Sequence, residues 1–398
     1  MVTMSTTSER QAIAERVRAI PASGIRRYFD LVSTIPDVIS LGVGEPDFAT
    51  PEQVSAAAAA PLAQADYAAT HYSSNYGLMS LREALAAHLQ ARYGVAYDPA
   101  QELLITVGVS EALDLAARAI LDPGDEVIIP EPSYVSYIPC TVLAGGVPVM
   151  VRTFEADQFE PDPAAIAAAV TPRTKAILLG YPNNPTGAVA SRETLQRIVQ
   201  IAVEHDLYII SDEIYDRLVY GGEHVCVSAL AGARDRTILL GGFSKAYAMT
   251  GWRVGYAAAR PDILEAMMKV HQYVIMCAPS AGQLAAQAAL LTAEQDVQQM
   301  VAEYDRRRRL IVDGLNRIGL PCFEPRGAFY AFPNITSTGL SADAFAEGLL
   351  REARVLVVPG EAFGPAGAGH VRCSYATALP RIEEALTRIE SYVRRVRG

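Results

Sequence analysis

From about residue 100 onward, short apolar runs rich in β-branched residues alternate with longer stretches of helical periodicity. Such runs predict seven strands, over 102–107, 126–130, 147–151, 175–180, 207–212, 237–242 and 254–259. They are apolar on both faces and are separated by helices, such as the one that Ser191 opens over 191–205. We therefore expect a mostly parallel sheet covered by helices on both sides. A sheet of this kind binds its ligand beyond the carboxyl ends of its strands.

After Pro261 the pattern becomes helix-rich. The arginine run 306–309 lies in this region and is predicted to be a solvated helix face. Short strands are expected within 328–335, 355–360 and 370–376. The last helix carries an apolar stripe, predicted to dock on a second, smaller sheet, made of Ile382, Leu386, Ile389, Val393 and Val396.

Together these patterns predict an α/β protein of two domains, a number that suits its 398 residues. The large domain holds the mostly parallel sheet, and the smaller domain is also α/β. We expect residues 1–45 to form an N-terminal arm and part of the small domain. Residues 46–290 would form the large domain and residues 291–398 the small C-terminal domain. The alanine-rich stretch 54–63 is predicted to be a helix rather than a linker.

Composition narrows the function classes. The chain has 51% hydrophobic and 20% charged residues, so it is an ordinary globular protein. Its net charge of -10 argues against a nucleic-acid partner. The N-terminus lacks the apolar core of a signal peptide, and no run is long enough to span a membrane, so we expect a cytoplasmic protein. The five cysteines are far apart and form no C-x-x-C pair, which favours reduced thiols over disulfides or a metal site.

Only three of the 34 lysine and arginine residues are lysines. Lys245 follows a predicted strand in a glycine- and serine-rich turn, at the end of the sheet where ligands bind. Lys175 lies at the start of its strand, and Lys269 falls within a predicted helix. A primary amine at the mouth of the sheet suits Schiff-base chemistry with an aldehyde cofactor. Position therefore selects Lys245.

Asp212 ends a predicted strand and is expected to face the same crevice. An acid here could hold magnesium in a nucleotide-binding site, but the chain lacks the G-x-x-x-x-G-K-[ST] phosphate loop. It could instead pair with a protonated ring nitrogen of a cofactor, or cap a following helix. Position alone leaves the last two interpretations open.

Two further turns follow predicted strands at the same edge. The segment TVGVSEALDLAARAIL has the strand-turn-helix form in which free backbone N–H groups bind an anion, here at Gly108, Val109 and Ser110. The turn GYPNNPTG places Asn184 where its side chain can donate a hydrogen bond to a ligand. A single turn of this type is ordinary, whereas several at one edge indicate a binding site.

The motifs SLGVGEPDF, GYPNNPTG, SDEIYD, FSKAYAMTGWRVGY and HVRCSYA, in this order, resemble the class I/II aminotransferases of pyridoxal phosphate (PLP) fold type I. The resemblance runs from about Ser23 to the C-terminus and is greatest to the branch with aspartate, aromatic and N-acetyl-diaminopimelate aminotransferases. It implies that Lys245 binds pyridoxal 5'-phosphate covalently and that Asp212 pairs with its ring nitrogen. It also implies a homodimer with shared active sites.

Further roles are implied by the same resemblance. Asn184 and Tyr215 would bind the phenolic oxygen of the cofactor, and Tyr134 would stack on its ring. The phosphate would be held by Val109, Ser110, Ser244 and Arg253, and by Tyr72 of the other subunit. Arg372 would bind the substrate α-carboxylate, with Gly44 and Asn184 beside it, because a guanidinium meets a carboxylate with two parallel hydrogen bonds. One position departs from the pattern: Gly242 stands where many relatives have a phosphate-binding serine.

The implied reaction is ping-pong transamination between an L-amino acid of aspartate or aromatic type and a 2-oxo acid such as 2-oxoglutarate. Two alternatives compete with it: a PLP-dependent carbon-sulfur lyase, and an aminotransferase-like regulatory protein. The regulator would need a DNA-binding domain, and only about 25 residues precede the region of resemblance. No motif identifies a second cation for a dicarboxylic substrate. The aromatic residues Tyr28, Phe29, Tyr76 and Phe363 would suit an aromatic or an aliphatic substrate side chain equally well, and Tyr28 and Phe29 are alternatively core residues.

Overall fold

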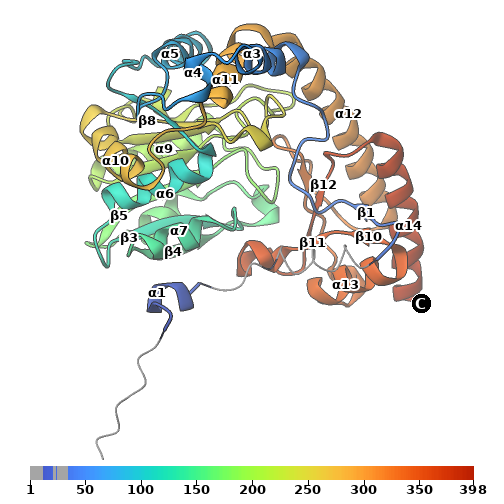
Figure 1. Cartoon of the computed structure of the whole chain (residues 1–398). Helices are drawn as coiled ribbons and strands as arrows, with labels where there is room; N and C mark the ends of the chain where they lie inside the picture. Colours follow the sequence, from blue (N-terminus) through green and yellow to red (C-terminus); the bar gives the residue numbers. More distant parts are fainter. Residues whose placement is uncertain (1–11, 21–23, 25–34) are drawn as a thin grey trace, which may run out of the picture.

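The structure is a computed structural model that describes residues 12–20, 24 and 35–398. Its centre is a seven-stranded sheet with the order β2-β8-β7-β6-β5-β3-β4 (Figure 1). The strands are β2 (Leu103–Thr106), β3 (Glu126–Glu131), β4 (Val147–Arg152), β5 (Thr174–Gly180), β6 (Tyr208–Asp212), β7 (Thr237–Gly242) and β8 (Gly255–Ala258). The strands β3 to β7 pair in parallel, and β8 is antiparallel to both β2 and β7. All seven predicted strands are confirmed, and no end differs by more than one residue.

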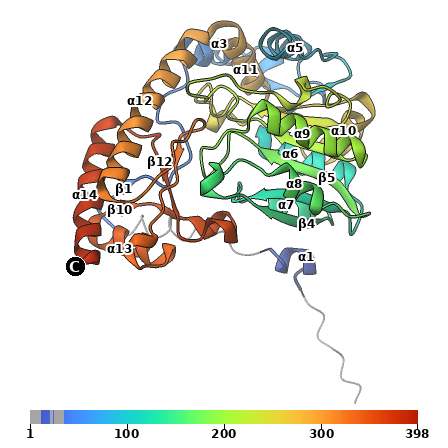
Figure 2. The same cartoon turned by 180° about the vertical axis from the view of Figure 1, so that it is seen from behind.

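Helices cover both faces of this sheet, as predicted. On one face lie α6 (Gly108–Ile120), α7 (Tyr137–Leu143) and α10 (Pro261–Val274), and on the other lie α8 (Pro163–Ala168) and α9 (Arg192–Glu204) (Figure 1, Figure 2). Ile210 of β6 packs in the core under α6 and α10, while its neighbour Ile209 packs in the core under α9. Because side chains alternate along a strand, Asp212 faces the α6–α7 side and Ser211 the α9 side. Ser191 caps α9 as predicted, accepting a hydrogen bond from the Thr194 amide at 3.2 Å.

A group of helices packs around the β2–β8 edge of the sheet. It consists of α3 (Glu52–Ala63), α4 (Tyr67–Thr70), α5 (Met79–Tyr93) and α11 (Ser280–Thr292), at the top of Figure 1. The alanine-rich stretch is therefore helical, as predicted. The long helix α12 (Glu294–Ile318) runs from this group down to the C-terminal part of the chain.

The C-terminal part contains two small sheets. Strand β1 (Ile39–Ser40) pairs in parallel with β10 (Val355–Leu356). Strands β11 (Val358–Pro359), β12 (Val371–Ser374) and β9 (Tyr330–Ala331) form an antiparallel sheet in that order. The domain boundaries at residues 45 and 290 stay a prediction, which the pairing of β1 with β10 supports. The remaining elements are α13 (Ala342–Ala353), α14 (Leu379–Arg397), α1 (Glu15–Arg18) and the short 3-10 helices Glu155–Asp157, Val227–Ala229, Thr250–Trp252, Thr336–Thr338, Gly360–Phe363 and Pro365–Gly367.

The expected docking of the last helix on the small sheet is wrong in the main. The apolar stripe of α14 is buried chiefly against α12 and α13, and α14 contacts the small sheets less, mainly at β10. At Gly314 of α12 the approach is so close that a Cβ atom would lie 2.5 Å from Leu386 Cδ1. Two amphipathic helices thus bury each other's apolar faces, and the small strands are too short to cover such a long stripe.

The arginine run is also not a uniformly solvated face. Arg306 and Arg309 are exposed, but Arg307 and Arg308 are buried. Arg307 donates to Asp47 Oδ1 at 2.7 Å, and Arg308 donates to Glu324 Oε1 at 2.6 Å. Four consecutive residues point to all sides of a helix, and α12 has packed neighbours on more than one side.

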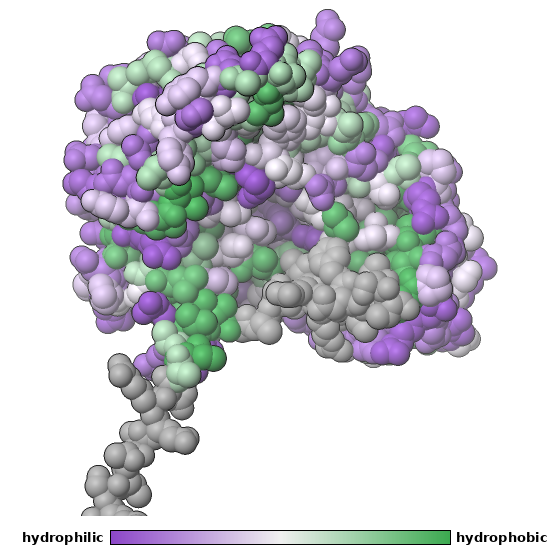
Figure 3. Space-filling model, viewed as in Figure 1, coloured by the Kyte–Doolittle hydropathy of each residue, from purple (hydrophilic) through white to green (hydrophobic). Residues whose placement is uncertain are grey.

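The face drawn in Figure 3 mixes hydrophilic and hydrophobic residues. Figure 3 shows apolar side chains gathered around α1, where Ile13 and Val17 are exposed. Within the described ranges, none of the helices combines the length and the hydrophobicity that crossing a membrane requires.

Candidate active site

A cavity of about 490 Å³ lies beyond the carboxyl ends of β5, β6 and β7, where the sheet meets the C-terminal part. Eleven of the twelve predicted site residues line it. They are Gly44, Val109, Ser110, Tyr134, Asn184, Asp212, Tyr215, Ser244, Lys245, Arg253 and Arg372. The twelfth, Tyr72, lies elsewhere. The cavity lies at the sheet edge that the strand pattern predicted.

Lys245 lies in the turn directly after β7 and points its amine into this cavity. Its Nζ donates a hydrogen bond to the Gly44 carbonyl at 2.6 Å. Burial lowers the pKa of Lys245 to about 8, and the nearby Arg372 and Arg253 act in the same direction against Glu45 and Asp212. The lowered pKa makes the neutral, nucleophilic form of this amine much easier to reach than that of an ordinary lysine, although the amine is still mostly protonated at pH 7.

Asp212 ends β6 and is buried, and each of its carboxylate oxygens accepts a hydrogen bond. The Tyr137 hydroxyl donates to Oδ2 at 2.9 Å, and the Ile214 amide donates to Oδ1 at 3.2 Å. Burial raises the pKa of Asp212 to about 6, against these hydrogen bonds. Residues 214–217 form a turn, so the interpretation of Asp212 as the cap of a following helix is wrong.

Arg372 is buried on β12 at the opposite side of the cavity. Its Nη1 donates to Asn184 Oδ1 at 2.9 Å, and its Nη2 donates to the Gly42 carbonyl at 2.6 Å. Its Nε has no hydrogen-bond partner among the described residues. The guanidinium carbon lies 4.5 Å from the centre of the Tyr330 ring and 4.8 Å from that of Phe363. The guanidinium group is thus fixed in place by its hydrogen bonds and by the two rings, and its planar shape and positive charge suit a carboxylate.

The start of α6 and Arg253 form a concave, positively charged corner of the cavity. Gly108 has φ +71°, which lets the chain turn from β2 into the helix. The Arg253 guanidinium lies so close that a Cβ atom at Gly108 would come within 2.6 Å of its Nη2. Free amides at a helix N-terminus, together with an arginine, suit a phosphate group.

Gly242 has a packing reason that the sequence did not reveal. A Cβ atom there would lie 2.9 Å from Val109 Cγ2 and 3.2 Å from the Gly255 Cα. A serine side chain at this position would therefore not fit beside Val109 without a shift of its neighbours.

Nine of the lining residues were not predicted, among them Tyr330, Glu45 and Tyr137. The Tyr330 hydroxyl lies 2.8 Å from the Tyr215 hydroxyl, and a side chain at Gly44 would overlap it. Glu45 accepts a hydrogen bond from Thr250. Tyr137 reaches Asp212 from α7. A signal existed for two of them, since Glu45 belongs to the GEPDF motif and Tyr137 follows Tyr134 by three residues.

The other predicted aromatic residues are placed away from the cavity wall. Tyr72 is 81% exposed. Tyr76 packs under Arg82, and the buried Phe363 packs on Arg372. Two further predicted pocket residues, Tyr28 and Phe29, lie outside the described residues.

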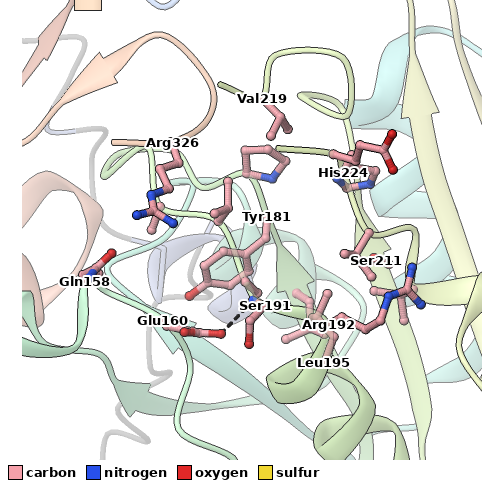
Figure 4. A pocket seen from close by; sticks show the side chains of 18 of the residues that line it. Gln158, Glu160, Tyr181, Ser191, Arg192, Leu195, Ser211, Val219, His224 and Arg326 are labelled. Atoms are coloured by element: carbon pink, nitrogen blue, oxygen red, sulfur yellow. Dashed lines mark hydrogen bonds between the residues drawn. The ribbon is translucent and has the colours of Figure 1, made fainter. Parts of the chain in front are cut away.

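A second cavity of about 270 Å³ lies on the α9 side of the sheet, where Ser211 points (Figure 4). It is lined by Tyr181, Arg192 and Arg326, among others, and Glu160 accepts a hydrogen bond from the Ser191 amide at 2.7 Å. It contains none of the predicted site residues. The described part of the chain brings together no three His, Cys, Asp or Glu residues that could hold a metal ion.

Comparison with known proteins agrees with this geometry. The sequence matches the family described as aminotransferase class I and II over residues 36–389. It is 45% identical to the aspartate aminotransferase of Pyrococcus abyssi and 44% identical to aromatic-amino-acid aminotransferase 2 of Thermococcus litoralis, each over 386 residues, 96% of this chain and 98% of the relative. The fold matches the solved aspartate aminotransferase of Thermus thermophilus with maleate at a TM-score of 0.91 and 40% identity, covering 96% of this chain and 100% of that one. The protein therefore belongs to the class I and II aminotransferase family.

Proposed function

We propose that this aminotransferase transfers the amino group of an L-amino acid to a 2-oxo acid with pyridoxal 5'-phosphate as its cofactor. The observation that carries the proposal is the arrangement of one cavity. It holds a lysine amine of lowered pKa, a buried carboxylate and a buried arginine fork.

The donor set fits the proposed cofactor. When bound, pyridoxal 5'-phosphate supplies an aldehyde that joins an amine and a ring that accepts electrons. Lys245 would hold the aldehyde carbon and Asp212 the ring nitrogen. Asn184 and Tyr215 would bind the phenolic oxygen, and Tyr134 would cover the ring face. The corner at α6, with Val109, Ser110, Ser244 and Arg253, would hold the phosphate.

The residues of the chain would bind the substrate, transfer the proton and stabilise the charge on the cofactor ring. Arg372 and Asn184 bind the α-carboxylate, which fixes the substrate Cα near the Lys245 amine. When it is neutral and not attached to the cofactor, the Lys245 amine would accept the proton from the substrate Cα. It would then donate this proton to the C4' carbon of the cofactor. Asp212 stays ionised to stabilise positive charge at the ring nitrogen. The reaction runs in two halves, one for each of the two substrates.

The proposed substrates are amino acids of aspartate or aromatic type, with 2-oxoglutarate as an acceptor. The names of the two relatives, one an aspartate and one an aromatic-amino-acid aminotransferase, support this range. We also propose that the protein acts in the cytoplasm as a homodimer. Support for the dimer comes from the exposed Tyr72 and from the exposed apolar side chains of Tyr273, Val274 and Met276.

The test is a half-reaction with single amino acids, read from the absorbance of the enzyme-bound cofactor. We expect wild-type protein to convert aspartate, phenylalanine or both, and 2-oxoglutarate to reverse the change. Lys245→Ala should lose both the covalent attachment of the cofactor and turnover, whereas Lys269→Ala should keep both. Release of pyruvate from a cysteine conjugate, with no need for a 2-oxo acid, would contradict the proposal in favour of a lyase.

A further inference from the structure

Tyr137 makes a buried contact that the proposed function does not by itself require. It is the first residue of α7, and its hydroxyl donates to Asp212 Oδ2 at 2.9 Å. Its side chain is almost fully buried. Burial beside the carboxylate holds the pKa of Tyr137 well above its usual value, so the hydroxyl remains a donor. The contact joins α7 to the end of β6 across 75 residues of sequence.

Gly180 provides the space for this hydroxyl. It ends β5 and is the direct neighbour of Asp212 in the parallel β5–β6 pair, so a side chain there would point to the same face as Asp212. A Cβ atom at Gly180 would overlap the Tyr137 hydroxyl and lie 2.8 Å from Tyr137 Cζ and 3.0 Å from Cε2. The backbone at Gly180 is not left-handed, so space rather than conformation explains this glycine.

The same short segment supplies two parts of the site. The Tyr137 amide donates to the Tyr134 carbonyl at 3.1 Å, and the two rings pack edge to face with centres 5.6 Å apart. Tyr134 lines the cavity where we propose that the cofactor ring binds. A shift of this segment therefore changes the ring-covering residue and the partner of Asp212 together.

We propose that Tyr137 is a positioning residue for the reaction: its hydroxyl, admitted by the missing side chain at Gly180, orients the Asp212 carboxylate and keeps it ionised to serve the ring nitrogen of the cofactor. The inference rests on the proposed function. With the Ile214 amide on Oδ1, the hydroxyl on Oδ2 completes a pair of donors that stabilises the anion. Without it, the shared proton shifts from the ring nitrogen toward Asp212, and the ring accepts electrons less well.

The test uses holoenzyme reconstituted with pyridoxal 5'-phosphate labelled with ¹⁵N in the ring. Tyr137→Phe keeps the ring packing and removes only the hydroxyl. We expect its ¹⁵N resonance to move from the protonated toward the unprotonated position, and its half-reaction rate to fall about 10- to 100-fold, the range for loss of a hydrogen bond to a charged group. Tyr97→Phe is the matched control, because it also removes a buried hydroxyl, bonded to Ser228 Oγ at 2.9 Å, outside the cavity. Its resonance and rate should equal those of the wild type.

A second variant tests the role of Gly180. Gly180→Ala should displace the Tyr137 hydroxyl and shift the resonance in the same direction. Both changes remove the same hydrogen bond. The double variant should therefore react no more slowly than the slower of the two single variants, whereas independent effects on the rate would multiply. Multiplying effects would overturn the coupling of Gly180 to Tyr137.

The outcomes separate this inference from the proposed function. If wild-type protein takes up no cofactor, the proposed function fails and the inference falls with it. If wild-type protein binds the cofactor with a protonated ring nitrogen and Tyr137→Phe leaves the resonance unchanged, only the inference is overturned. A lower rate with an unchanged resonance also overturns it, because a purely structural role of Tyr137 would slow the reaction without moving the proton.

Discussion

The guanidinium of Arg372 lies between two aromatic rings and gives two of its nitrogens to protein acceptors before any substrate arrives. Held in this way, it loses little freedom when a carboxylate binds. Lysine at this position could not replace the planar fork, because its ammonium is a point charge on a flexible stem.

We therefore expect Arg372→Lys to lower kcat/KM for amino acids about 10- to 100-fold, mainly through KM, from the loss of hydrogen bonds to a charged group. Steady-state kinetics with one amino donor measure this. Arg306→Lys, on an exposed face of α12, is the control and should leave KM unchanged. An unchanged KM in Arg372→Lys would remove this residue from the substrate site.

The ionised form of Asp212, which the proposed function needs, is unfavourable for the stability of the folded protein without its cofactor. Its pKa rises on folding from the ordinary 3.8 to about 6, because burial disfavours its charge. A carboxyl group shifted in this direction contributes stability that is fully present below the unfolded pKa and is lost as the pH rises through the folded value. Near neutral pH the ionised group therefore costs stability in the cofactor-free protein.

Asp212→Asn should accordingly raise the Tm of the cofactor-free protein at about pH 7, and the gain should shrink as the pH falls from about 6 toward 4. Turnover of the holoenzyme should be lost in the same variant. Thermal unfolding followed by circular dichroism across this pH range checks the first expectation. A lower Tm than wild type near neutral pH would show that the ionised carboxylate is stabilising instead.

The sequence predicted those site residues that follow a predicted strand or belong to a recognisable motif. Eleven of the predicted residues line a common cavity. Strand ends and turns indicated Lys245, Asp212, Asn184, Val109 and Ser110, and the family resemblance implied the others. Tyr330 was missed because its contact with Tyr215 spans 115 residues of sequence, and no local pattern encodes such a contact. The spacing of Tyr137 from Tyr134 was a local signal, but its contact with Asp212 spans 75 residues and could not be predicted.

At the scale of elements, the strands of the large sheet were predictable and their order was not. An apolar run is a local property, whereas the antiparallel insertion of β8 between β2 and β7 depends on pairing over long distances. The match to solved structures confirms fold type I, which the motif resemblance implied. The docking of α14 failed as a prediction because an apolar stripe states that a face is buried but not against what.

Helix α12 joins the sheet region to the C-terminal part, and Arg307 ties it to the segment that carries Gly44 and Glu45 into the cavity. Removing this buried cation leaves Asp47 without its partner. Arg307→Met should lower the free energy of unfolding by about 1.5–3 kcal/mol, the range for loss of a hydrogen bond to a charged group. The adjacent Arg306→Met should change it by less than about 0.5 kcal/mol, as is usual for an exposed site. Urea denaturation of both variants measures the difference, and equal effects would contradict a role for the Arg307–Asp47 pair.

At the scale of the whole molecule, the cavity of one chain lacks one of the residues proposed to bind the cofactor phosphate. Tyr72 is exposed and absent from the lining of its own cavity. If it serves the cavity of a second copy, a mixed dimer of Lys245→Ala and Tyr72→Ala chains has one site with both native residues.

We expect co-expressed Lys245→Ala and Tyr72→Ala chains to regain transamination above that of either variant alone. Lys245→Ala mixed with Arg372→Lys is the control, because both residues line the cavity of the same chain and no native site can form. Recovery in the control mixture, or none in the first, would place Tyr72 outside a shared site.

The three lysines have a practical consequence for labelling and immobilisation. Amine-directed reagents meet few targets on this surface, and Lys269 on α10, with a side chain 63% exposed, is the most open of the three by position. Lys245 is held inside the cavity, where the proposed cofactor would cover it. Amine-directed conjugation is therefore expected to use Lys269 as the main lysine anchor, while the proposed cofactor would protect Lys245.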